Sequence, residues 1–133
     1  MIWRATLDDV DRVLPIAIRF NDNYTDYPII PEKARSVIEL FITEHVAFCS
    51  ETGFIGGIVQ PDPMRDATFL IEMAWYSEDR TGIALLKRFT EEGVALGVDE
   101  VRMCTMDTSS RIADKILLRA GYSVTETSYK LKL

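Results

Sequence analysis

Residues 67–86, ATFLIEMAWYSEDRTGIALL, decide the fold of this chain of 133 residues. In the first half of the stretch only Thr68 and Glu72 are polar, and a nearly continuous apolar run predicts a strand buried on both faces. Residues 77–81 are a short polar loop, after which an amphipathic helix is expected to begin near Gly82. The loop therefore joins the carboxyl end of a buried strand to a helix N-terminus, where free backbone N–H groups attract phosphate.

Glu72 is the anomaly in this strand, because it places a carboxyl group in the middle of an apolar run. An ionised carboxylate buried without a partner is so costly that it usually forms an ion pair or takes up a proton. Strict alternation along a strand puts Glu72 on the same face as Leu70, Ala74 and Tyr76, none of which is a cation. Two interpretations follow. Glu72 is either a member of a structural ion pair or a base of raised pKa that faces a cleft.

Length and composition predict one domain, residues 1–133, of an ordinary cytoplasmic protein. The formal net charge of −6 argues against a general nucleic-acid binder, and it suits either solubility or a cationic substrate. Cys49 and Cys104 lack metal-ligand spacing and lie in apolar segments, so we expect buried, reduced thiols and no metal site. No apolar run reaches membrane-spanning length, and the first residues do not resemble a signal peptide. We therefore expect no nucleic-acid or membrane partner.

The remaining pattern alternates between strand and helix signals. Thr6 begins a capping-box-like helix start, Pro31 opens a second helix, and Gly97 suits the left-handed end of the helix that starts near Gly82. The predicted order is β-α-α-β-β-β-α-β-α-β, an α/β (α+β) fold with a mixed, mostly antiparallel sheet and helices on both faces. The expected strands cover residues 1–5, 45–49, 54–60, 67–76, 99–106 and 122–133.

This order resembles the GNAT superfamily of N-acetyltransferases over essentially the whole chain. Residues 2–9, IWRATLDD, look like the opening strand and helix cap of that family, and residues 72–76, EMAWY, look like its central strand. The exit from the cofactor helix at Leu96-Gly97-Val98 and the helix and turn at 111–122, RIADKILLRAGY, also match. The EMAWY segment is most similar to small acetyltransferases of bacteriophages and prophages.

The resemblance implies a cofactor, acetyl-CoA, and a catalytic base. Many members of the superfamily place a catalytic glutamate on the strand that Glu72 occupies, where it deprotonates an ammonium substrate directly or through water. The strand after it would pair with the pantetheine arm, with the amide of Met73 or Ala74 stabilising the thioester carbonyl. The loop and helix start would hold the diphosphate. The residues expected to bind the cofactor are Met73, Ala74, Trp75, Tyr76, Ser77, Arg80, Thr81, Gly82, Ile83, Ala84 and Ser110.

The cofactor loop departs from the family pattern, Arg/Gln-x-x-Gly-x-Gly/Ala. One register puts Gly82 at the final glycine, Arg80 at the middle one and Ser77 at the Arg/Gln position. The other makes Gly82 the middle glycine and Ala84 the last, and we prefer the first because it keeps the apolar helix face in place. In either register Glu78 and Asp79 put negative charge beside the expected diphosphate.

The acceptor site and the general acid are less defined. Where many members have a tyrosine acid this chain has Leu117, so no acid is assigned. Tyr24 and Tyr27, in the loop between the first two helices, and Tyr129, near the chain end, are candidates for substrate contact, although exposed tyrosines are also common in loops. Simpler roles remain open for several of the residues above: core packing for the Trp75 side chain, helix capping for the polar loop residues and for Ser109 or Ser110.

The sequence thus predicts an acetyl-CoA-dependent N-acetyltransferase that acts on a primary amine by direct attack, without a covalent enzyme intermediate. The acceptor can be a small molecule, a peptide or a protein, and a homodimer is one further expectation. The alternative is a catalytically degenerate protein that keeps the fold to bind a partner or modulate a host. The acidic loop and Leu117 favour this alternative.

Overall fold

The computed structural model describes residues 1–106 and 111–133. Its elements follow the predicted order up to the last helix, with a short 3-10 helix, η1 (Leu7–Asp9), before the first α-helix. The helices are α1 (Val10–Tyr24), α2 (Pro31–Glu44), α3 (Gly82–Leu96) and α4 (Ile112–Arg119). The strands are β1 (Trp3–Arg4), β2 (Val46–Cys49), β3 (Gly53–Pro61), β4 (Thr68–Ser77) and β5 (Glu100–Arg102).

The five strands form one sheet in the order β1-β2-β3-β4-β5. The first four pair antiparallel with their neighbours, and β4 pairs parallel with β5. The helix α3 makes the connection between the two parallel strands, as a parallel pair requires. The predicted fold class, a mixed and mostly antiparallel sheet, is confirmed.

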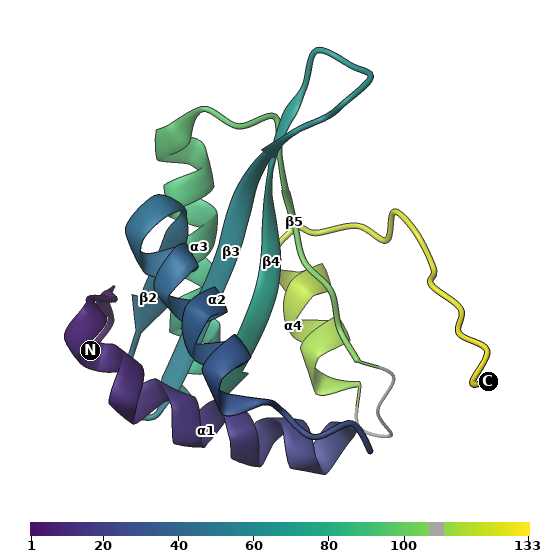
Figure 1. Ribbon diagram of the computed structural model, residues 1–133. Coiled ribbons are helices and arrows are strands. Elements are labelled where there is room, and N and C mark those ends of the chain that lie inside the picture. The colour runs from purple at the N-terminus through teal and green to yellow at the C-terminus, as the bar shows by residue number, and fades with distance from the viewer. Residues whose placement is uncertain (107–110) are drawn as a thin grey trace.

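Helices cover both faces of the sheet, and each face has its own apolar core (Figure 1). On one face α1 and α2 pack over a cluster that includes Val13, Phe41 and Phe54. On the other face α3 inserts Leu85 and Phe89 against strand residues. Both side chains are fully buried, so the helix that follows the polar loop is held firmly on the sheet.

A β-bulge in the middle of β4 changes which face each residue occupies. Gly56 lies opposite Ala74 but Gly57 lies opposite Glu72, so Met73 is the extra residue in β4. A Cβ on Gly57 would meet Phe89 of α3, which places Glu72 on the α3 side of the sheet. The prediction that Glu72 shares a face with Ala74 is therefore wrong, because the bulge interrupts the strict alternation.

The final strand expected at residues 122–133 does not form. After Tyr122, whose N–H donates to the Leu117 carbonyl at 3.0 Å, no backbone hydrogen bond is made by the described residues of this segment. Figure 1 shows it as an extended trace that runs away from the sheet. The expected strand at 99–106 is also shorter, because its pairing with β4 ends at Arg102. A strand needs a neighbouring edge, which local sequence cannot supply.

Local signals for helix starts and ends are mostly confirmed. Pro31 is in the first turn of α2, and Gly97 ends α3 in the left-handed conformation with φ of 72°. The predicted burial of Cys104 is wrong, because this cysteine is exposed. Cys104 lies beyond Arg102, where the pairing of β5 with β4 ends, so the apolar pattern there does not mark core.

The bulge can be tested through its glycines. A Cβ at Gly57 would collide with the Ile71 carbonyl group and with Phe89, so we expect Gly57→Ala to cost about 3 kcal/mol or more. At Gly97 nothing lies within 4 Å, and Gly97→Ala should cost only about 1 kcal/mol for its left-handed backbone. Urea denaturation of both variants measures the difference, and equal losses would contradict the close approach at Gly57.

Candidate active site

The two parallel strands separate after a short paired region. Phe69, Leu70 and Ile71 pair with residues 100–102, and beyond them β4 continues to Ser77 with only β3 as its partner. Within the described residues, no other strand reaches the second edge of β4 along 72–77. Alternate backbone N–H and C=O groups of this edge are therefore open to an extended ligand.

Glu72 lies at the point where the strands separate. Its residue is 7% exposed, and its carboxylate accepts a hydrogen bond from the Cys104 N–H, with 3.2 Å between N and Oε2. None of the ion pairs among the described residues includes it. Burial raises the pKa of Glu72 to about 7, although the Cys104 amide lowers it in part. Of the two sequence interpretations, the structural ion pair is not formed.

Asp79 organises the loop between β4 and α3. Its Oδ1 accepts hydrogen bonds from the Thr81 N–H at 2.8 Å, the Thr81 hydroxyl at 2.6 Å and the Ser77 hydroxyl at 2.8 Å. These bonds, led by those from Thr81, hold the pKa of Asp79 below its ordinary value. The Thr81 hydroxyl also lies 2.7 Å from that of Ser50, a buried residue at the β2–β3 turn. The loop is therefore fixed from both sides.

Glu78 points away from the helix start. Its Oε1 lies 2.8 Å from both Nε and a terminal nitrogen of Arg19 in α1, and its N–H donates to the Thr52 carbonyl at 3.0 Å. Of the two acidic loop residues, only Asp79 therefore faces the backbone of the loop. The long-range pair with Arg19 could not be read from the sequence.

The first turn of α3 keeps its backbone donors free. In the part of the chain that the structure describes, the N–H groups of Gly82, Ile83 and Ala84 have no hydrogen-bond acceptor, and Arg80 is exposed without an ion pair. Free amides at a helix start together with a nearby cation suit a phosphate group. Asp79 adds an opposing charge at this place but does not take these three donors.

The side chains of the expected cofactor strand have different environments. Trp75 is partly buried on the α3 side, where its Nε1 donates to the Gly82 carbonyl at 3.0 Å and so ties β4 to the helix start. Tyr76 is buried on the opposite side beside Phe54, and its hydroxyl has no hydrogen-bond partner among the residues that the structure describes. Met73 is 58% exposed. These residues can thus offer a ligand mainly their backbone.

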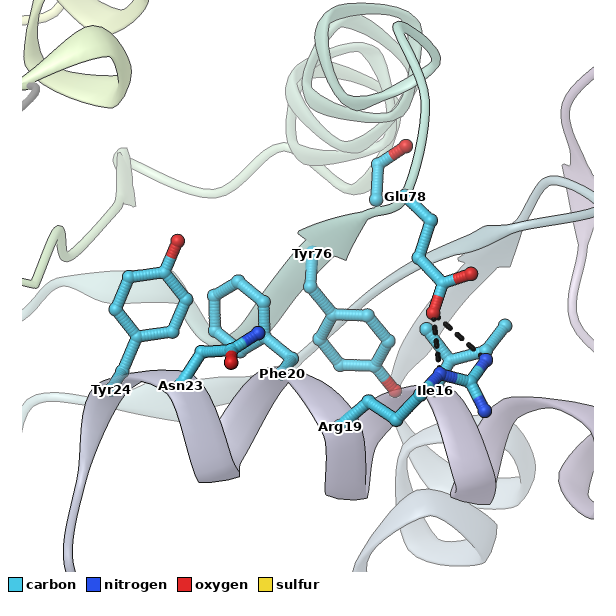
Figure 2. Close-up of a pocket in the computed structure, with 8 residues that line it drawn as sticks. Ile16, Arg19, Phe20, Asn23, Tyr24, Tyr76 and Glu78 are labelled. Carbon is cyan, nitrogen blue, oxygen red and sulfur yellow. Dashed lines mark hydrogen bonds and ion pairs between the residues drawn. The ribbon is translucent and has the colours of Figure 1, made fainter.

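A cavity of about 290 Å³ lies between α1 and the carboxyl end of β4 (Figure 2). In Figure 2 the side chains of α1 form its floor, and the Arg19–Glu78 pair closes one end. Phe20 stacks between Tyr24 and Tyr76, with ring centroids 4.5 Å and 5.4 Å away. The cavity is therefore aromatic on one side and charged on the other.

A second cavity, of about 560 Å³, lies between the end of α1 and residues 130–132. Tyr24 and Tyr27 line it, but Tyr129 does not and is 92% exposed. Glu72 lines neither of these two cavities. The expected contact at Ser110 lies outside the described residues.

Leu117, at the position where many GNAT members carry a tyrosine acid, is apolar and buried. Leu117 is 9% exposed, and the nearby Tyr122 hydroxyl is engaged with the Thr90 hydroxyl of α3 at 2.7 Å. Burial raises the pKa of Tyr122, which keeps this phenol protonated. Leu117 therefore cannot act as a general acid, and the Tyr122 hydroxyl is already engaged with Thr90.

Comparison with known proteins places the fold. No family model and no curated protein sequence matches the chain. Among solved structures, a "probable acetyltransferase" matches with a TM-score of 0.80 at 18% identity, covering 100% of this chain and 97% of that one. An acetyltransferase of Trypanosoma brucei matches with a TM-score of 0.71 at 14% identity, covering 100% of this chain and 99% of that one. A ribosomal-protein-alanine N-acetyltransferase of Brucella melitensis biovar Abortus matches with a TM-score of 0.70 at 12% identity, covering 100% of this chain and 99% of that one.

At such low sequence identity, these structural matches show the fold alone. The fold is that of GNAT-like acetyltransferase structures. Within the described residues, no helix has both the length and the apolar character that crossing a membrane requires.

The buried carboxyl of Glu72 should make stability depend on pH. Its folded-state pKa of about 7 exceeds the ordinary 4.5, so between these pH values the folded protein holds a proton that the unfolded chain has released. The free energy of unfolding should therefore fall as pH rises through this window, by on the order of 3 kcal/mol. Glu72→Gln, which is neutral and can still accept from Cys104, should remove the fall. Urea titrations at several pH values measure it, and parallel curves for both proteins would contradict the raised pKa.

Proposed function

We propose that this protein is an acetyl-CoA-dependent N-acetyltransferase that acylates a primary amine by direct attack, with Glu72 as the general base. The observation that carries the proposal is a buried carboxyl group with no ion-pair partner, placed where β4 and β5 separate. A base with a pKa of about 7 is half ionised near neutral pH and can take a proton from an ammonium group.

The described residues fit coenzyme A at two places. The open edge of β4 offers Met73, Ala74, Trp75 and Tyr76 as backbone partners for an amide-bearing arm. The helix start offers further donors and a cation for a diphosphate, and there the residues that would hold it are Ser77, Arg80, Thr81, Gly82, Ile83 and Ala84. When bound, acetyl-CoA would supply the acetyl group as an activated thioester.

The residues of this chain would then act on the acceptor. Glu72 deprotonates the ammonium group, and its hydrogen bond to the Cys104 amide fixes the orientation of the carboxylate. An amide of Met73 or Ala74 is the candidate donor for the negative charge that develops on the carbonyl oxygen. Met73 is the bulge residue and has no partner in the register with β3.

Tyr24 and Tyr27 remain the candidate acceptor contacts, since both line the cavity at the end of α1. For Tyr129 only the sequence prediction remains, and the same holds for Ser110 and for the similarity to phage acetyltransferases. The chemistry predicted at Glu72 requires a primary amine, and it does not distinguish a small molecule from a peptide or a protein.

One observation favours the alternative of a degenerate, partner-binding protein. Asp79 is held as an anion beside the first turn of α3, where a diphosphate would approach it. A protein in which Asp79 repels the diphosphate would show no affinity for coenzyme A at this helix start. Cofactor binding therefore separates the two functions.

Glu72→Gln should lower turnover by at least about a hundredfold, since general bases contribute in that range. The variant should keep its affinity for acetyl-CoA, because the carboxyl group hydrogen-bonds, among the described residues, only to the Cys104 amide. Release of free coenzyme A with a panel of primary amines measures turnover, and calorimetry measures affinity. In the parent protein the rate should rise with pH around 7. Unchanged turnover in the variant would remove Glu72 from the mechanism.

Arg80→Ala should weaken coenzyme A binding about three- to tenfold, because one exposed cation near a phosphate is worth on the order of 1 kcal/mol. Lys87→Ala is the matched control, since Lys87 is an exposed cation of the same helix beyond its first turn. Acetyl-pantetheine, which has no nucleotide diphosphate, should bind both variants as it binds the parent. Equal effects of the two substitutions on coenzyme A would argue against a diphosphate site at the helix start.

A further inference from the structure

Residues 123–133, here called the tail, have the pattern of a strand but no partner. Every residue of the tail is exposed; Lys132 lies 4.0 Å from Asp26 and over the Tyr27 ring, and residues 130–132 line the second cavity. An extended segment whose backbone groups are all unpaired is a ready template for pairing with another strand.

The tail is amphipathic at strand spacing. One face carries Val124, Glu126, Ser128, Lys130 and Lys132. The other carries Ser123, Thr125, Thr127, Tyr129, Leu131 and Leu133, of which the last three are 92%, 84% and 109% exposed. Three large apolar side chains on one face of an exposed strand indicate that another surface covers them.

The charges of the tail are complementary to a second copy of the tail. If two tails pair antiparallel about a two-fold axis at Ser128, Glu126 of each lies opposite Lys130 of the other. In the same register Tyr129 lies opposite Thr127, and Leu131 lies opposite Thr125, so the apolar faces coincide. The two-fold axis thus pairs Glu126 with Lys130 twice, once in each direction. A strand of unrelated sequence would not place matching charges at both positions.

The sheet offers a place for the paired tails. The outer edge of β5 has no strand beside it in the described residues. Two isolated strands are only marginally stable, so an open edge in each copy is the support that such a pair needs.

We infer that the tail is a homodimer interface, in which the tails of two copies pair antiparallel and Glu126 of each copy meets Lys130 of the other. This inference does not depend on the acetyltransferase proposal, because it uses no residue assigned to catalysis or to cofactor binding.

Sedimentation equilibrium of the full chain tests the interface. We expect a dimer, and we expect Glu126→Lys and Lys130→Glu each to weaken it about tenfold or more, because each turns two attractive pairs into two repulsive ones. The double variant should dimerise like the parent. An equimolar mixture of the two single variants should form a heterodimer, in which both opposite-charge pairs are restored.

Lys132→Glu is the control, because it makes the same charge change opposite Val124 in this register and should leave the dimer within about twofold. A chain that stays monomeric would overturn the inference. So would a dimer that is insensitive to both single substitutions, or one that depends on Lys132 instead. Unchanged circular dichroism of the variants will show that the exposed substitutions leave the fold intact.

Discussion

The separation of β4 from β5 is the constraint that determines both the environment of the Glu72 carboxyl group and the open edge of β4. Parallel pairing stops after Ile71, and the single hydrogen bond from the Cys104 amide to Glu72 spans the gap where the ladder would continue. A carboxyl group therefore replaces a backbone partner at this point. It stays buried, loses its usual acidity and leaves the edge of β4 open. The same geometry explains both the cost of Glu72 to stability and its suitability as a base.

The rest of the molecule holds this opening in place. Phe89 and Leu85 anchor α3 on the sheet, while the hydroxyl of Ser50 and the carboxylate of Asp79 fix the loop that leads into the helix. Arg19 draws Glu78 toward α1 and away from the free amides. The loop thus keeps an acidic composition and still presents N–H donors. Whether the remaining charge of Asp79 permits a diphosphate to bind is the point at which the transferase and the degenerate protein differ.

Much of the fold could be predicted from the sequence, because its signals are local. The apolar run around Glu72, the proline that opens α2 and the glycine that ends α3 each specify an element through backbone or burial preferences. The bulge at Met73 could not be predicted, since it arises from how two strands meet. The same is true of the Cys104 contact with Glu72, a long-range interaction. Residues 122–133 show the converse: their strand pattern is good, yet beyond Tyr122 they make no backbone hydrogen bond among the described residues, although the outer edge of β5 is open.

Amide chemical-shift mapping with coenzyme A tests directly whether the separation of β4 and β5 forms a cofactor site. We expect the ligand to shift the amide signals of the open β4 edge, Met73 and Trp75 among them, together with those of Gly82, Ile83 and Ala84. The two groups should titrate with one dissociation constant, because one extended molecule would contact both. Shifts confined to other surfaces, or none at millimolar ligand, would contradict the claim that the separation of β4 and β5 forms a cofactor site.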